Sequence, residues 1–221
     1  MIPTVGEVIS DEDSYYSLIS SLTAMPIDFM VQLEDWGFDF TELTAYQLFL
    51  LLFPAIQMQD TSLIFGDLRL QYFTRMIDEK NGNPVLVDTV NDIVIDRAIH
   101  GQIQSVLRKL HHLEKNNRRP GNEEAKKYML ERARIKQERR RKRKRDSVLE
   151  SLIIAMVNTE QYKYNYESTL DLSIYQFNES VRQIQRKVDY DNRMIGVYAG
   201  TVDVSKIDQK DLIWIGDLEN K

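Results

Sequence analysis

Residues 132–145 read Arg132-Ala133-Arg134-Ile135-Lys136-Gln137-Glu138-Arg139-Arg140-Arg141-Lys142-Arg143-Lys144-Arg145, and this stretch sets the organisation of the chain. Ten of its fourteen residues are Lys or Arg, and the last seven form an unbroken basic run. Seven consecutive cations on a helix cover every face of it, so no apolar face remains there for packing. The stretch therefore predicts a solvated helical connector, or a fraying hinge, between two folded parts.

The sequence on either side of the basic stretch is acidic. Residues 1–100 hold 4 Lys or Arg against 16 Asp or Glu, residues 101–150 hold 17 against 7, and residues 151–221 hold 8 against 11. A cationic segment of this kind needs a polyanion, an acidic protein surface or open water around it. Three interpretations stay open: a helical connector, docking to an acidic protein such as the N-terminal half of another copy, and binding to nucleic acid.

Composition narrows the class of protein. With 221 residues and 43% hydrophobic content, the chain can bury a core as one large domain or two small ones. It has no cysteine, which excludes disulfides and thiolate ligands. Residues 1–7 lack the pattern of a signal peptide, and the longest apolar run, residues 48–53, is far shorter than the roughly 20 residues of a membrane span. We expect a soluble protein that stays inside the cell that makes it.

Apolar spacing predicts a mainly helical α+β protein. Helices are expected at residues 14–22, 27–33, 41–53, 96–113, 122–157 and 173–188. Residues 61–95 are rich in strand formers around the turn Asn81-Gly82-Asn83-Pro84, which favours a small β-hairpin or meander. Residues 162–166 alternate like a short strand. In the helix at 96–113, one apolar stripe is expected to consist of Ile99, Ile103, Val106, Leu107 and Leu110.

These elements divide the chain into two small lobes joined by a long basic helix. We assign residues 1–115 to an acidic N-terminal lobe, residues 116–146 to a linker and the basic helix, and residues 147–221 to a C-terminal lobe. Pro120-Gly121 is the strongest break, and Asn122 is expected to cap the helix that follows. We find no stop signal before about Val157, which makes this helix about 50 Å long at 1.5 Å per residue.

The basic stretch supplies the candidate binding residues for a polyanion or a protein partner. They are Arg132, Arg134, Lys136, Arg139, Arg140, Arg141, Lys142, Arg143, Lys144 and Arg145. On nucleic acid they would contact phosphates, so binding would be blind to sequence and sensitive to salt. Few aromatic residues interleave the run, which argues against stacking on single strands.

We predict a non-catalytic protein without cofactor or metal. Glycine-rich phosphate loops and the G-x-S-x-G elbow are missing from the sequence. His111 and His112 are adjacent and point about 100° apart on a helix, so they cannot chelate one ion as an i, i+4 pair does. We interpret them and His100 as surface or boundary residues, and Asp189 and Asp191 as part of a polar turn.

The C-terminal third resembles proteins encoded in the morphogenesis regions of tailed bacteriophages. The resemblance rests on three runs: Thr169-x-x-Leu172-Ser173-x-x-Gln176-Phe177-x-x-Ser180-Val181-x-x-Ile184, then Gly196-Val197-Tyr198-Ala199-Gly200-Thr201-Val202-Asp203, then Asp211-Leu212-Ile213-Trp214-Ile215. It covers about residues 147–221 and consists of packing residues, so it transfers no site residues.

The resemblance implies an assembly or structural protein of a tailed phage particle, similar to a tail assembly chaperone and acting through protein contacts. The alternative is a viral protein that binds nucleic acid without sequence preference through residues 132–145. Expected partners are other phage structural or assembly proteins, further copies of the chain, or nucleic acid, and no membrane. The expected location is the host cytoplasm during assembly, with the virion as the other candidate.

Overall fold

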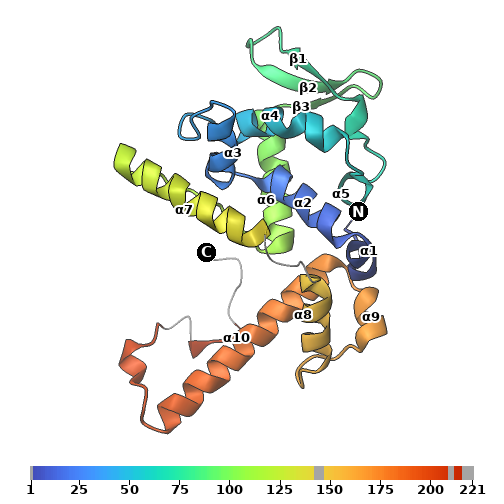
Figure 1. Ribbon diagram of the computed structural model, residues 1–221. Helices are drawn as coiled ribbons and strands as arrows, with labels where there is room; N and C mark the ends of the chain where they lie inside the picture. The colour runs from blue at the N-terminus through green and yellow to red at the C-terminus, as the bar shows by residue number, and fades with distance from the viewer. Residues whose placement is uncertain (1, 142–146, 209–211, 216–221) are drawn as a thin grey trace.

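The computed structural model describes residues 2–141, 147–208 and 212–215, and it shows a mainly helical α+β fold (Figure 1). The elements are α1 (Val5–Ser10), α2 (Glu12–Thr23), η1 (Pro26–Phe29), α3 (Met30–Asp35), α4 (Ala45–Gln57), α5 (Ser62–Phe65), η2 (Leu70–Tyr72), β1 (Thr74–Ile77), β2 (Pro84–Asp88), β3 (Ile93–Ile95), α6 (Arg97–His111), α7 (Glu123–Arg141), α8 (Val148–Val157), α9 (Tyr166–Leu170), α10 (Ile174–Tyr198) and η3 (Val204–Lys206). The predicted fold class is confirmed.

Helix α4 lies at the centre of the N-terminal part and contacts α2 and α6. Thr44 caps its first turn, accepting a hydrogen bond from the backbone N–H of Gln47 at 3.2 Å. Its apolar residues are buried nearly all round, as predicted, and Leu48 has no exposed surface. The predicted end at Phe53 is wrong: the helix continues through Pro54 to Gln57. The turn beyond the proline is kept because it buries Ile56 in the same core.

The β-sheet is a three-stranded antiparallel meander in the order β1-β2-β3. Tyr46 of α4 anchors it by donating to the carbonyls of Pro84 and Ile95, at 3.0 and 2.9 Å. The predicted meander is therefore confirmed over residues 74–95. Residues 62–65 and 70–72 form the helical turns α5 and η2 instead of strands. In α5, the Thr61 carbonyl accepts the amide of Phe65 at 2.9 Å, and Asp60 accepts that of Ser62 at 2.9 Å.

Helix α6 begins where predicted, with Asp96 accepting the Ile99 amide at 2.8 Å. Its buried face differs from the predicted apolar stripe, since Val106 is 58% exposed. Two polar residues, His100 and Gln104, lie on the buried face with Leu107. Gln104 is accommodated because its amide donates to the Ala24 carbonyl at 3.1 Å.

His100 is a core residue, which corrects its assignment to the surface or boundary. Its imidazole stacks on the Phe49 ring with a centroid distance of 4.4 Å, and only 2% of the residue is exposed. His111 and His112 are partly buried, as expected of boundary residues. His111 contacts the Tyr15 hydroxyl through Nε2 at 3.0 Å, and His112 Nε2 lies 3.3 Å from a Glu179 oxygen.

The single long helix predicted for residues 122–157 is wrong. Ser147 has an extended ψ of 120° and caps a new helix, α8, by accepting the Glu150 amide at 2.9 Å. The carboxylate of Glu12 accepts the next two amides, those of Val148 and Leu149. A negative charge at a helix N-terminus is favourable, so α8 starts where α2 supplies this carboxylate.

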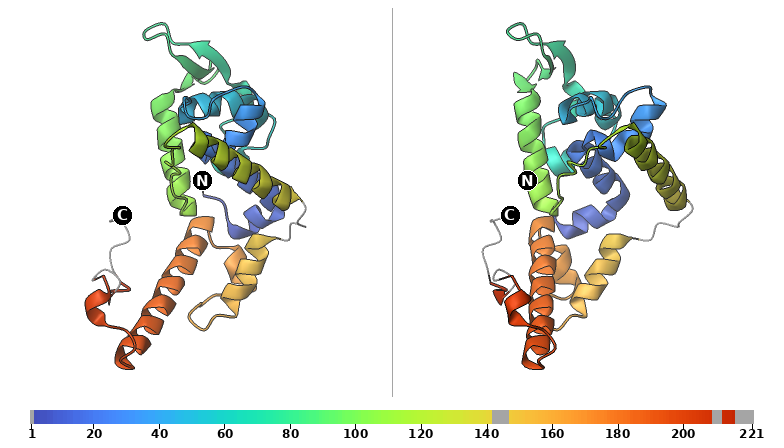
Figure 2. Two further views of the ribbon diagram at one scale, coloured as in Figure 1. Left: turned by 60° about the vertical axis from the view of Figure 1, so that its left-hand side comes forward. Right: turned by 90° about the vertical axis from the view of Figure 1, so that its left-hand side faces the viewer.

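Helices α8, α9 and α10 group below the N-terminal part in Figure 1. The strand predicted at 162–166 is wrong, because Asn165 caps α9 by accepting the Ser168 amide at 2.8 Å. Tyr162 instead turns inward, where its hydroxyl and that of Thr169 are 3.1 Å apart. Helix α10 extends ten residues beyond the predicted end at Val188 and projects away from the rest of the molecule (Figures 1 and 2).

The N-terminal residues pack among the C-terminal helices. The Val5 amide donates to the Leu172 carbonyl, and the Ile174 amide to the Pro3 carbonyl, both at 2.8 Å. Val5 and Val8 of α1 are fully buried, as are Ile174 and Phe177 of α10. One apolar core therefore runs through both parts of the molecule. The division of the chain at residues 115 and 147 stays a prediction.

Candidate partner-binding surface

Helix α7 carries the described part of the basic stretch, and its first turn forms as predicted. Asn122 accepts the Ala125 amide at 2.8 Å. Glu123 and Glu124 occupy the first turn, where negative charge is favoured. The helix does not cross solvent between the two parts of the molecule. It lies along α3 of the N-terminal part, which corrects the expected solvent-spanning connector for residues 123–139.

One flank of α7 is paired with the acidic N-terminal part. Lys126 Nζ is 2.5 Å from Asp39 Oδ2. Two turns later, Arg134 is 2.6 Å from a carboxylate oxygen of Asp35 and 3.6 Å from one of Glu34. Leu130 lies between these two cations on the same flank and is 6% exposed. The flank thus joins opposite charges around a buried leucine.

The Lys126–Asp39 contact shifts both titrating groups. The hydrogen bond from Lys126, followed by those from the Thr41 hydroxyl and amide, lowers the pKa of Asp39 to about 2. The same hydrogen bond raises the pKa of Lys126. Beside Asp35, the pKa of Arg134 is raised as well. Arg134 of the basic stretch, and Lys126 just before that stretch, are therefore already held by carboxylates of their own chain.

The opposite flank of α7 forms one wall of an open groove of about 710 Å³. The other wall comes from α3 and from the segment that precedes α7. The lining residues are Met30, Arg118, Tyr128, Met129, Arg132, Ala133, Ile135, Lys136 and Arg139. Five of them are apolar or aromatic, four are cationic, and none is acidic. Tyr128 is 58% exposed and Ile135 44% exposed, which leaves the apolar floor open to solvent.

The ten predicted binding residues separate into different environments. Arg134 is paired with α3, whereas Arg132, Lys136 and Arg139 line the groove. Arg132 lies over the Tyr128 ring, 5.6 Å from its centroid, and donates to its hydroxyl at 3.2 Å. Arg140 and Arg141 end α7 without described side chains, and the four predicted residues at 142–145 lie outside the described residues.

Six residues that line the groove were not among the predicted binding residues: Met30, Arg118, Tyr128, Met129, Ala133 and Ile135. Helical spacing carried a signal for Tyr128, which shares a face with Arg132 and Ile135 at i, i+4 and i+7. Met30 and Arg118 come from other segments, and their place in the groove depends on how α7 packs. No local pattern in the sequence marks them.

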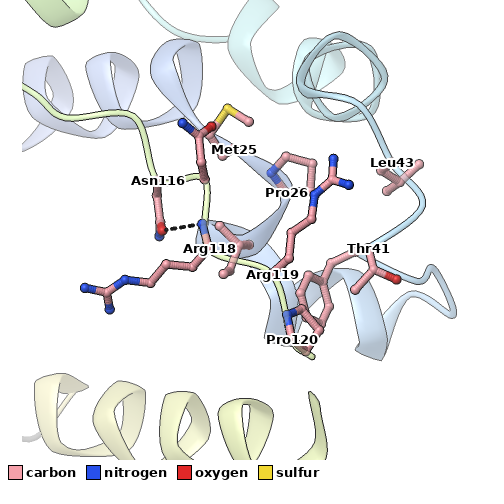
Figure 3. Close-up of a pocket in the computed structure, with 11 residues that line it drawn as sticks. Met25, Pro26, Thr41, Leu43, Asn116, Arg118, Arg119 and Pro120 are labelled. Atoms are coloured by element: carbon pink, nitrogen blue, oxygen red, sulfur yellow. Dashed lines mark hydrogen bonds between the residues drawn. The ribbon is translucent and has the colours of Figure 1, made fainter. Parts of the chain in front are cut away.

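A second, smaller cavity of about 290 Å³ lies beside residues 116–120, the segment that precedes α7 (Figure 3). Met25, Pro26 and Phe40 line it, together with residues 116–120. Asn116 ties this segment to η1 by donating to Asp28 at 2.8 Å. Figure 3 shows Arg118 and Arg119 pointing to opposite sides of the segment, so that Arg118 also reaches the groove beside α7.

The other titratable candidates stand apart from this surface. Asp189 and Asp191 lie within α10, not in the predicted polar turn, and Asp191 is 2.5 Å from Lys187 Nζ one helical turn before it. In the part of the chain that the structure describes, no group of three or more His, Asp or Glu side chains is arranged to hold a metal ion. None of the described helices is both long and apolar enough to cross a membrane.

Comparison with protein families gives a match in the C-terminal part of the chain. Residues 141–219 match the family model described as YomV second domain, a phage-type domain. The match covers almost all of the predicted C-terminal lobe and agrees with the phage resemblance of that region. No curated protein and no solved structure matches the chain. The comparisons thus indicate a phage protein.

Proposed function

We propose that the protein is a non-catalytic assembly or structural protein of a tailed phage particle, acting in tail morphogenesis through contacts with other proteins. The match of residues 141–219 to a phage-type domain is the observation that carries the proposal. The runs at 169–184 and 196–203, which lie within the matched region, resemble tailed-phage morphogenesis proteins and point the same way.

The surface beside α7 supports a role in protein contacts. Arg134 already binds Asp35 and Glu34, so this helix engages carboxylates on a folded protein surface. Tyr, Met and Arg are enriched at the centres of protein interfaces, and the groove offers Tyr128, Met129 and Arg132 side by side. An assembly factor has to present such a surface to its partner.

The test is genetic and morphological. The gene is deleted in a phage or prophage that encodes the chain, and lysates are examined by electron microscopy and by mass spectrometry of purified particles. We expect filled heads with missing or aberrant tails, restored by a plasmid copy of the wild-type gene. Normal tails and normal infectivity in the deletion would overturn the proposal. Mass spectrometry of the wild-type particles reports whether the protein stays in the virion.

A second candidate function is binding to nucleic acid without sequence preference. Within the described residues, no carboxylate lies in ion-pair distance of Arg132, Lys136 or Arg139, which leaves a row of cations along one flank of α7. Unrelated duplexes should then bind equally well, with log K falling against log salt by roughly 0.9 for each phosphate contact. Fluorescence anisotropy at low salt decides the matter, because absence of binding there eliminates this candidate.

A further inference from the structure

The groove beside α7 combines two chemistries that suit different parts of one ligand. Its floor is apolar, formed by Met30, Met129, Ala133 and Ile135, and Tyr128 adds an aromatic face. Its rim is cationic, formed by Arg118, Arg132, Lys136 and Arg139. A ligand that fills it must bury apolar surface and present negative charge at its edges. A phosphate backbone would pair with the cations of the rim but would leave the apolar floor exposed to solvent.

The charged side chains that line the groove are all cationic, whereas the carboxylates of α3 are engaged on the other flank of α7. The carboxylates nearest to α7 on α3, Glu34 and Asp35, are engaged by Arg134 on the other flank. Asp39 is likewise held by Lys126. Among the described residues, no acidic side chain lines the groove. An incoming anion therefore meets four cationic side chains and no acidic one among the lining residues.

The length of the lining on α7 indicates the size of the ligand. Tyr128, Arg132, Ile135 and Arg139 follow one another at i, i+4, i+7 and i+11, so they share one helix face. Eleven residues span about 16 Å of helix, equal to three turns. A helix of similar length, laid alongside, places apolar residues at i, i+3, i+4 and i+7 on the floor.

We propose that this groove binds an acidic amphipathic helix of a partner protein, with large apolar side chains against Met129 and Ile135 and with Asp or Glu at the rim. This inference rests on the proposed function and names the chemistry of the partner. Most of the affinity comes from the apolar floor and Tyr128, because aromatic and apolar anchors usually dominate interfaces. The cations on the rim set orientation and encounter rate.

The experiment measures binding of a defined probe to the full-length protein. The probe is a fluorescent helical peptide of about 15 residues, which is near the minimum length for a helix in water. It carries leucines at i, i+3, i+4 and i+7, with glutamates beside them. A second peptide of the same composition has its leucines and glutamates scrambled so that no amphipathic face forms. Anisotropy is recorded at 0.15 M salt, where the Debye length is about 8 Å.

Three variants of α7 locate the binding site. Lys136→Glu reverses a charge on the rim, and Ile135→Ala removes apolar surface from the floor. Lys127→Glu is the matched control, since Lys127 is exposed on the same helix, does not line the groove, and lies nine residues or about 14 Å from Lys136. Circular dichroism establishes that all three keep the wild-type helix content.

We expect the amphipathic peptide to bind and the scrambled peptide to bind far more weakly. Lys136→Glu should weaken binding roughly fivefold or more, the equivalent of about 1 kcal/mol. Ile135→Ala should weaken it as well, and Lys127→Glu by less than about twofold.

Three results would overturn the inference. They are equal affinity for both peptides, equal loss in Lys127→Glu and Lys136→Glu, or no binding of the amphipathic peptide. Displacement of the peptide by duplex DNA, with the same sensitivity to Lys136→Glu, would assign the groove to nucleic acid instead. Failure here is distinct from failure of the proposed function, because the deletion phenotype in tail assembly is measured without reference to the groove.

Discussion

His100 is a titratable side chain in a position that disfavours its charged form. Burial, with a smaller contribution from the charge of Arg108, lowers the pKa of its imidazole to about 4. Its Nε2 has no hydrogen-bond partner in the described structure, and its ring stacks on Phe49. The side chain therefore acts as a neutral aromatic residue of the core at neutral pH.

This placement predicts a dependence of stability on pH. The folded pKa lies below the ordinary value of 6.5, so the unfolded chain takes up the proton first and stability falls as pH decreases from about 6.5 to 4. The loss attributable to this group amounts to about 3 kcal/mol at most. Urea unfolding of wild type and His100→Leu at several pH values measures it. The variant should show a shallower decline, and identical slopes would contradict the prediction.

Lys126 offers a second test at the scale of one residue. Replacing it with Met removes the main cause of the lowered pKa of Asp39, which should rise from about 2 toward the ordinary 3.8. The contribution of the pair to stability is present above pH 3.8 and is lost as pH falls toward 2. NMR titration of the Asp39 carboxyl carbon measures the shift. Lys127→Met, the control, should leave Asp39 unchanged, and an Asp39 pKa that stays near 2 in Lys126→Met would refute the assignment.

At the scale of one element, α7 is predicted to owe its position to packing more than to charge. Leu130→Ala should cost about 2–3 kcal/mol, since the leucine is buried against the N-terminal part. Arg139→Gln should change the free energy of unfolding by less than about 1 kcal/mol, because the arginine is exposed on the rim of the groove. Denaturant unfolding compares them. Equal losses would show that α7 is held by its charges.

Local signals explain which elements sequence reasoning found. Asn122 caps α7 as predicted, and α6 begins at the predicted place with Asp96 as its cap, since a short polar side chain before a helix acts within three residues. The start of α8 also had such a signal in Ser147-x-x-Glu150, a pairing typical of a helix start, which the basic run before it obscured. The second cap of α8, Glu12, comes from a distant segment and had no local signal.

The candidate surface was predictable only in part. Its cations are apparent in the composition of residues 132–145, and three of them line the groove. Asp35, Asp39 and Glu34 neutralise particular cations of α7. Their choice depends on the packing of α7 along α3, a tertiary contact between segments about 100 residues apart. The apolar floor follows from the same contact. Charge patterning identifies such a stretch, and packing decides which of its residues remain accessible.

At the scale of the whole molecule, α1 is predicted to stabilise the C-terminal helices. Val8→Ala should cost about 2 kcal/mol, because the valine is fully buried in the shared core. Hydrogen exchange should show the loss of protection in α9 and α10 as well as in α1. Met58→Ala, at a residue that is 88% exposed, is the control and should change nothing. Loss of protection confined to α1 would contradict the prediction.

Self-association is a further prediction at this scale. Residues 1–100 and 101–150 carry opposite net charge, and exposed apolar residues such as Trp36, Tyr198 and Ile215 are available to supply binding free energy. We expect a homo-oligomer that loosens as salt is added. Sedimentation at low and high salt tests this, and a monomer under both conditions at tens of micromolar protein would assign the exposed surfaces to a different partner.

The pairing of Pro3 and Val5 with Ile174 and Leu172 also constrains the order of events during synthesis. Residues 3–5 pair with residues that are translated about 170 residues later, and closing so long a loop delays such contacts. Until then the apolar side of α1 is exposed in the nascent chain. Residues 3–5 can therefore dock only after residues 172–174 have been synthesised, and the core that they share with α10 is completed after that point.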